Sequence, residues 1–192
     1  MPRPRRTFSP GLSAHVIQRG NNRSAIFAGR PDYEVFLDLL RTAAGRHAVA
    51  VHAYALMTNH YHLLVTPDTT NGLPLMMKAL NGNYVRYYNR HHQRIGTLWN
   101  GRYRGIPIGD ERYWLTCLTY IEQNPARAGM TSDLAAYPWS SYRFHASDQA
   151  ESSWVAPHPV YLALGRCENE RRAAYRTISA DLMDPTQAFP FL

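Results

Sequence analysis

Residues 57–65 read MTNHYHLLV, and the alternation in this stretch decides the predicted fold. Successive side chains of a β-strand point to opposite faces, so His60, His62 and Leu64 share one face. The other face, which begins with Tyr61, is expected to meet the hydrophobic core. The two histidines stand roughly 6 to 7 Å apart at the Cα level, which lets both imidazoles reach one divalent cation. The alternative is that they only decorate a solvent-facing strand.

Three further stretches predict strands. VAVHAYALM at 49–57 alternates in the same way, and only two residues join it to the histidine strand, which predicts an antiparallel hairpin. AHVIQRGN at 14–21 is ended by a Gly-Asn-Asn turn signal, and GRYRGIPIG at 101–109 supplies the last strand. We therefore expect a sheet of at least four strands.

The segments between these strands have apolar residues at helical spacing. The first helix has Pro31 and Asp32 in its first turn, and the third is expected to stop at Asn124 because Pro125 disfavours helical geometry in the residue before it. A short fourth helix, ENERRAAYRTIS, is predicted at 168–179. The three main helices are expected at 30–47, 72–92 and 111–124.

The element order β-α-β-β-α-β-α predicts an α+β fold. Its expected form is a ferredoxin-like sandwich, with an antiparallel sheet of four or more strands and the helices packed on one face. A chain of 192 residues is long enough for one domain with a real core. The pattern weakens after about residue 146, so residues 147–192 are expected to form an appendage.

The charge balance indicates a polyanionic partner. Lys and Arg number 21 against 14 Asp and Glu, which gives a net charge of +7, and the isoelectric point is near 9.6. Nearly all the positive charge is arginine, which can fork onto phosphate and stack on bases. Thirteen tyrosines would suit a single-stranded nucleic acid. An ordinary basic surface is the alternative reading.

Other classes of protein are less compatible with the sequence. Cys117 and Cys167 fit neither a zinc nor a redox spacing. Nothing near the start resembles the apolar core of a signal peptide, and no run approaches the ~18 apolar residues of a membrane span. We therefore expect a cytoplasmic protein with reduced thiols and no membrane partner.

A metal at the histidine pair needs an oxygen ligand, because no Cys or His set completes it. Tyr120 and Asn124 are four residues apart and share one helical face, whereas Glu122 lies about 200° around the helix from Tyr120. That helix could bring a tyrosine hydroxyl and an amide oxygen to one metal-bound phosphate. A packed tyrosine is the alternative for Tyr120. His15, on the first strand, could approach the site, although a structural role is preferred for it.

Five ordered motifs carry a resemblance to a known family: HVIQRGNNR, VHAYALMTNHYHLLV, LNGNYVRYYNRHH, LWNGRYRGIPI and YIEQNPARAG. Together they resemble the single-tyrosine transposases of the HUH superfamily and, within them, the REP-associated tyrosine transposases. The resemblance implies that residues 1–146 are a catalytic domain.

The resemblance also implies a mechanism. His60, His62 and Asn124 would hold Mg²⁺ or Mn²⁺, and Tyr120 would attack a phosphate of single-stranded DNA, leaving a 5′-phosphotyrosine and a free 3′-hydroxyl. Relatives place Gln where this chain has Asn124, which leaves its role as a direct ligand open. The implied substrate is a hairpin of palindromic repeats, nicked and rejoined by a monomer or homodimer.

Arginines beside the motifs are the predicted DNA contacts, with an ordinary surface role as the alternative. Trp99 and Tyr103 could stack on unpaired bases or pack in the core. Two other functions stay open: a module that only binds hairpin DNA or RNA, and a metallohydrolase that uses an activated water. The predicted DNA-binding set is Arg19, Arg23, Arg86, Arg102 and Arg104.

Overall fold

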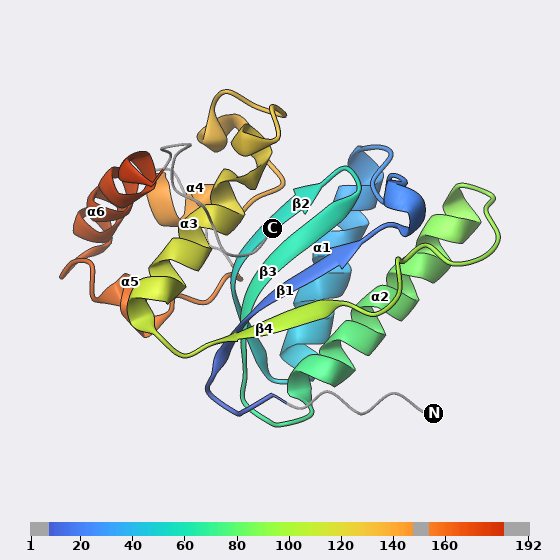
Figure 1. Ribbon diagram of the computed structural model, residues 1–192, viewed down its shortest axis with the longest axis horizontal. Coiled ribbons are helices and arrows are strands. Elements are labelled where there is room, and N and C mark those ends of the chain that lie inside the picture. Colours follow the sequence, from blue (N-terminus) through green and yellow to red (C-terminus); the bar gives the residue numbers. More distant parts are fainter. Residues whose placement is uncertain (1–7, 148–153, 183–192) are drawn as a thin grey trace.

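A four-stranded antiparallel sheet forms the centre of the molecule (Figure 1). The computed structural model describes residues 8–147 and 154–182 of the chain. The strand order β2-β3-β1-β4 and the element order β1-α1-β2-β3-α2-β4 give the predicted ferredoxin-like α+β fold, which is confirmed. The strands are β1 (Ser13–Arg19), β2 (Val49–Met57), β3 (His60–Pro67) and β4 (Arg104–Ile108).

Two helices cover one face of the sheet, α1 (Arg30–Arg46) and α2 (Gly72–His91). The start of α1 is fixed by Asp32, whose Oδ2 accepts hydrogen bonds from the backbone N–H groups of Ala28 at 2.7 Å and Gly29 at 3.3 Å. The core between these helices and the sheet contains the predicted inward face of β3. Its largest side chains include Phe36, Leu40, Tyr61, Leu63 and Tyr84, all fully buried.

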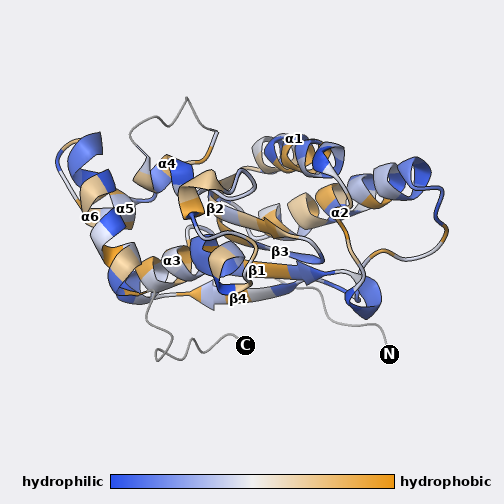
Figure 2. Ribbon diagram, turned by 90° about the horizontal axis from the view of Figure 1, so that it is seen from above, coloured by the Kyte–Doolittle hydropathy of each residue, from blue (hydrophilic) through white to orange (hydrophobic). Residues whose placement is uncertain are grey.

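The third helix, α3 (Glu111–Arg127), lies on the opposite face, so the expectation of helices on one face only is wrong for this element. Figure 2 shows α1 and α2 on one side of the sheet and α3 on the other. The physical reason is that the histidine face is also apolar along part of its length. Leu64 lies on that face and packs in one buried cluster with Trp114 and Leu118 of α3.

α3 also continues for three residues beyond the predicted end at Asn124. Pro125 has no N–H to donate to the carbonyl of Ile121, four residues earlier. The Asn124 side chain compensates, because its Nδ2 donates to the carbonyl of Tyr120 at 2.8 Å and approaches that of Ile121 at 3.5 Å. A side chain at the proline thus supplies donors to this turn, and the helix passes through it.

The elements after α3 pack on its outer side and on the β2 edge. They are η2 (Leu134–Ala136), α4 (Tyr142–Ala146), α5 (Pro159–Leu162) and α6 (Glu168–Asp181), and α6 confirms the helix predicted at 168–179. Trp154 stacks on Tyr54 of β2 with ring centroids 5.7 Å apart. The division at residue 146 stays a prediction, and of residues 147–192 the structure describes 147 and 154–182.

Glu122 of α3 is the centre of these contacts. Its carboxylate is fully buried and accepts hydrogen bonds from Ser141 Oγ, from His145 Nδ1 at 2.8 Å and from Tyr175 Oη at 2.6 Å. One buried carboxylate therefore links α3 to α4, to α6 and to the segment between η2 and α4.

Across residues 8–147 and 154–182, no helix is both long enough and apolar enough to cross a bilayer.

Candidate functional site

His60 and His62 lie on β3, on the sheet face that α3 partly covers. Their ring centroids are 5.1 Å apart and the ring planes are 77° apart. His62 is buried, with 4% of its surface exposed, whereas His60 is half-buried. The alternation predicted from the sequence therefore brings two imidazoles together at one end of the strand.

Each histidine is held through its Nδ1 atom. Asn59 Oδ1 lies 2.7 Å from His60 Nδ1, and Asn59 in turn donates to the carbonyl of Arg23 at 3.1 Å. His15 Nε2, from the neighbouring strand β1, lies 2.8 Å from His62 Nδ1. Metal-binding histidines are usually oriented by such a bond to the second ring nitrogen. In both rings this leaves Nε2 as the atom that can bind a cation.

Tyr120 of α3 faces the same site. Its ring centroid is 5.8 Å from that of His62 and 6.0 Å from that of His15, and both contacts are edge-to-face. The side chain is buried. Burial raises the pKa of the Tyr120 hydroxyl, and a hydrogen bond with the Asn124 side chain opposes this shift. The predicted tyrosine and the histidine pair are thus neighbours, although they are about sixty residues apart in the chain.

Asn124 lies one turn after Tyr120 and is half-buried. Its amide nitrogen is engaged with the carbonyl oxygens of Tyr120 and Ile121. The Oδ1 atom is therefore the one that could reach a metal. In the structure Asn124 acts on the helix itself, and its role as a ligand remains a prediction.

The histidines of the site are neutral at pH 7. Burial, followed by the charge of Arg19, lowers the pKa of His60 to about 4. Burial, followed by the charge of Arg104, lowers the pKa of His15 to about 4. Burial also lowers the pKa of His62 well below its usual value. A neutral imidazole keeps the lone pair that a metal requires.

The five predicted arginines are distributed over different parts of the surface. Arg19 is directly opposite His60 in the β1–β3 register, and Arg104 pairs with Ile17 on the histidine face. Arg23 belongs to the short helix η1 (Asn21–Arg23), and Arg102 precedes β4. Arg86 lies on α2, which covers the other face of the sheet. Arg19 and Arg104 are therefore the two whose positive charge bears most directly on the histidines.

A second group of potential ligands, Asp32, His91 and His92, lies at the N-terminus of α1 and the C-terminus of α2. Their ligand atoms are all within 4.8 Å of one another. The Asp32 carboxylate already accepts hydrogen bonds from two backbone N–H groups and from Tyr87 Oη at 3.1 Å, and His92 Nε2 lies 3.0 Å from it. These contacts account for the cluster as a helix cap that packs the two helices together.

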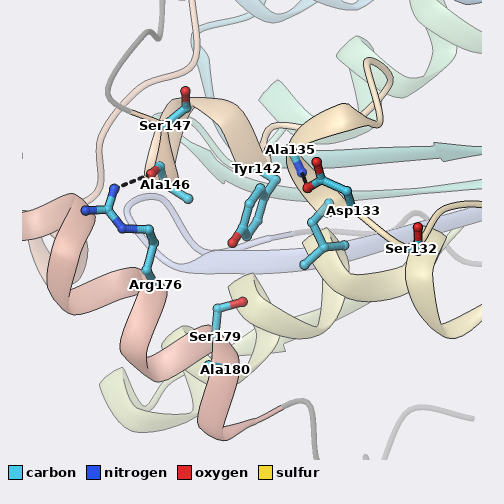
Figure 3. Close-up of a pocket in the computed structure, with 10 residues that line it drawn as sticks. Ser132, Asp133, Ala135, Tyr142, Ala146, Ser147, Arg176, Ser179 and Ala180 are labelled. Carbon is cyan, nitrogen blue, oxygen red and sulfur yellow. Dashed lines mark hydrogen bonds between the residues drawn. The ribbon is translucent and has the colours of Figure 1, made fainter.

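A cleft of about 800 Å³ opens between η2, α4 and α6 (Figure 3). Arg176 lines this cleft and donates a hydrogen bond to the carbonyl of Ala146 at 2.6 Å. The lining residues include Tyr142, Asp133 and Ser179 but neither Tyr120 nor any histidine. This cleft is therefore separate from the histidine site.

Sequence reasoning gave His15 a structural role and did not single out Asn59 or the burial of Glu122. The position of His15 depends on the register between β1 and β3, which the sequence does not reveal. Asn59 had a local signal, because it directly precedes His60 in a tight hairpin. The burial of Glu122 could not be predicted, because α3 was expected on the same face of the sheet as the other helices.

Comparison with known proteins gives one family and one shared fold. The profile of the family described as "Transposase IS200 like" matches residues 9–124. No curated protein has significant sequence similarity to the chain. A solved structure of a REP-associated tyrosine transposase bound to a REP hairpin superposes with a TM-score of 0.59 at 15% identity, covering 83% of this chain and 96% of that one. A candidate transposase from Deinococcus radiodurans gives a TM-score of 0.43 at 23% identity, over 59% of this chain and 90% of that one.

Proposed function

Because the chain belongs to the IS200-like transposase family, we propose that it nicks and rejoins single-stranded DNA through a covalent bond to Tyr120. The proposal depends on one contact between α3 and β3, in which the Tyr120 ring packs edge-to-face against His62. His60 lies beside His62 on the same strand. The proposed nucleophile and the two proposed metal ligands are thus neighbours, which supports their acting on one phosphate. The hairpin held by the structural relative makes a hairpin with single-stranded flanks the proposed substrate.

The donor set fits a divalent cation. His60 and His62 are neutral and are oriented so that Nε2 remains for binding, and Asn124 could add an oxygen. Mg²⁺ or Mn²⁺ accepts nitrogen and oxygen ligands of this kind. When bound, the ion would polarise the scissile phosphate and stabilise the charge that develops on it.

Tyr120 performs the covalent step. Its Oη attacks the phosphorus in line with the 3′-oxygen; the new bond is Oη–P, and the bond that breaks is P–O3′. The phenolic proton is balanced by the proton taken up at the leaving 3′-oxygen, so the products are a 5′-phosphotyrosine and a 3′-hydroxyl. A phenolate leaves more readily than an alkoxide, and therefore another 3′-hydroxyl can reverse the step and rejoin the strand.

The arginines near the histidine face would hold the DNA backbone. Arg19 and Arg104 flank the pair and carry charge that a phosphate neutralises. Such contacts give affinity and register without reading the sequence. Arg23, Arg86 and Arg102 extend the proposed DNA-binding set, although Arg86 would have to contact a part of the DNA that passes over α2.

Incubation of the protein with a labelled hairpin oligonucleotide and Mn²⁺ or Mg²⁺ tests the proposal, with the hairpin taken from palindromes beside the gene. A denaturing gel should show a metal-dependent protein–DNA adduct with wild type and none with Tyr120→Phe. Tyr113→Phe is the matched control, because Tyr113 lies two turns earlier on almost the same face of α3. Tight binding without any adduct would leave a binding module as the function. A free 5′-phosphate without an adduct would indicate a metallohydrolase.

A further inference from the structure

A second cleft, of about 620 Å³, lies between α2 and the loop that precedes β4. In Figure 1 this loop runs from the end of α2 back to β4. The volume is within the range of about 300–1,000 Å³ that is usual for small-molecule sites. This α2–β4 cleft is lined by residues that include Leu75, Met77, Lys78, Trp99, Arg102 and Tyr103.

The cleft combines an apolar wall with a basic rim. Trp99 and the largely buried Tyr103 line the cleft with aromatic rings. Leu75 is 47% exposed and is one of four exposed large apolar side chains among the described residues. Lys78 and Arg102 are exposed at its edge, and no acidic side chain is among the described residues that line it. The first turn of α2 also has no acidic residue, so its positive end favours an anion. Aromatic rings beside cations are the pattern that binds unpaired bases and their phosphates.

The aromatic wall is held in place by hydrogen bonds. Trp99 Nε1 donates to the carbonyl of Asn81 at 3.2 Å, and the Oδ1 of the same asparagine accepts a bond from Tyr61 Oη at 2.7 Å. The rings of Trp99 and Tyr61 meet edge-to-face with centroids 5.9 Å apart. Because Tyr61 is the residue between the two histidines, the wall of the cleft and the histidine strand form one packed unit. A fixed ring loses little entropy when a base stacks on it.

The cleft also lies at the histidine end of the sheet. Trp99 forms an isolated β-bridge with Gly20, and the Asn100 N–H donates to the carbonyl of Arg19 at 2.8 Å. Arg19 is opposite His60. A strand leaving the histidine face would cross from β3 past β1 and β4, about 10 Å, and then pass around the edge of a sheet layer that is about 10 Å thick. That path needs no more than about six nucleotides at the ~3.4 Å rise of a stacked strand.

We propose that the α2–β4 cleft binds an unpaired nucleobase from the single-stranded flank of the DNA, stacked on Trp99, with its phosphate near Lys78 and Arg102. This inference rests on the proposed function for the identity of the ligand but uses a different surface from the histidine site. It makes the cleft a second, non-catalytic contact that would select which flanking nucleotide is positioned relative to the scissile phosphate.

Lys78 provides a specific probe, because it is the only lysine in the 192-residue chain. An amine-reactive acylating reagent modifies Lys78, and modification is read by mass spectrometry as loss of tryptic cleavage after that residue. The Tyr120→Phe protein is used, so that no nicking occurs, and a lysine-containing peptide in the same tube corrects for reagent decay. The probes are a hairpin with single-stranded flanks and the same hairpin with a blunt end.

The flanked hairpin should slow acylation of Lys78 severalfold at saturation, and the blunt hairpin should not. Trp99→Ala should weaken binding of the flanked hairpin by between roughly fivefold and a hundredfold, whereas Trp99→Phe should retain most of the affinity. When an abasic nucleotide is moved stepwise along the flank, it should weaken binding as much as Trp99→Ala does at one position. Trp99→Ala combined with the abasic nucleotide at that position should weaken binding little more than either change alone. Leu162→Ala, at an exposed leucine of α5, is the matched control and should leave binding unchanged.

Equal acylation with both hairpins, or additive effects of Trp99→Ala and the abasic site, would overturn the inference. Slow acylation of Lys78 in the absence of DNA would also overturn it. If acylation without DNA becomes fast when the protein is diluted, a second copy of the chain covers the cleft. If acylation stays slow on dilution, other segments of the same chain cover it. An adduct at Tyr120 without protection of Lys78 contradicts only this inference, whereas protection without an adduct contradicts only the proposed chemistry.

Discussion

His15 Nε2 and His62 Nδ1 lie 2.8 Å apart, so neighbouring strands share a buried hydrogen bond directly beside Tyr120. The bond occupies one ring nitrogen of His62 and fixes the orientation of the ring. With Nδ1 as the donor in this bond, His62 would present the lone pair of Nε2 to a cation. A histidine that sequence reasoning treated as structural thus becomes the positioning partner of a proposed metal ligand.

Replacing His15 should weaken metal binding. His15→Phe keeps an aromatic ring in the buried position but removes the bond to His62, so Mn²⁺ affinity measured by titration calorimetry should fall roughly 10- to 100-fold. His91→Gln is the control and should leave the affinity unchanged. The reverse pattern, with loss only in His91→Gln, would place the ion in the Asp32, His91 and His92 cluster instead.

The helix contacts of Asn124 and its proposed role as a metal ligand can be separated with a substitution at Pro125. Asn124→Ala removes both the donor to the α3 carbonyls and the proposed oxygen ligand, so stability and Mn²⁺ affinity should both decrease. In the double variant Asn124→Ala/Pro125→Ala, the new N–H can bond to the carbonyl of Ile121, and the unfolding free energy should recover by roughly 1 kcal/mol. Metal affinity should stay low. If affinity recovers together with stability, Asn124 only stabilises the helix and is not a ligand.

The buried Glu122 cluster should stabilise α3 measurably. Tyr175→Phe removes one of three hydrogen bonds to a fully buried carboxylate, which should lower the unfolding free energy by roughly 1.5–3 kcal/mol in urea titrations. Tyr113→Phe, at a half-buried position on the same helix, should change it by less than about 0.5 kcal/mol. Equal effects of the two substitutions would show that the contact between α6 and Glu122 contributes little.

His52 should make stability depend on pH. Burial lowers its pKa to about 4, although the hydrogen bond between Nδ1 and the carbonyl of Ala156 opposes the shift. The pKa of a histidine in the unfolded chain is about 6.5, so between these two pKa values the unfolded chain binds more protons than the folded chain. The contribution of His52 to stability is therefore complete above about pH 6.5 and is lost as the pH falls toward 4. Between pH 7 and pH 5, protonation of His52 should lower the unfolding free energy by roughly 2 kcal/mol.

Urea titrations of wild type and His52→Gln at the two pH values test this. Other buried histidines make the unfolding free energy depend on pH in both proteins. The unfolding free energy lost between pH 7 and pH 5 should therefore be smaller in His52→Gln by roughly 2 kcal/mol. Equal losses would show that His52 is protonated in the folded protein at pH 5.

Local patterns predicted the strands, α1, α2 and α6, because each of these elements has a periodicity that a sequence displays directly. The order of motifs also predicted the family that the profile match shows. Two errors concern α3. The helix passes through Pro125 because the Asn124 side chain supplies donors there, and it covers the histidine face because Leu64 and its neighbours on β2 are apolar. Both depend on contacts between residues distant along the chain or on side-chain geometry, which periodicity does not encode.

The same limit applies to the candidate site. The His60 and His62 pair and the spacing of Tyr120 and Asn124 follow from the periods of a strand and a helix. The contribution of His15 follows from strand register, and the α2–β4 cleft follows from the bridge between Gly20 and Trp99. Neither is visible before the sheet is assembled.

Locating the covalent bond within the chain tests whether Tyr120 is the nucleophile that attacks the DNA. The adduct formed with Mn²⁺ is trimmed with nuclease and digested with trypsin, which releases residues 113–127 as one peptide containing both Tyr113 and Tyr120. Fragmentation in the mass spectrometer should place a nucleotide, joined through its 5′-phosphate, on Tyr120. A nucleotide on Tyr113 or on any other peptide, or a 3′-phosphate linkage, would contradict the proposed mechanism.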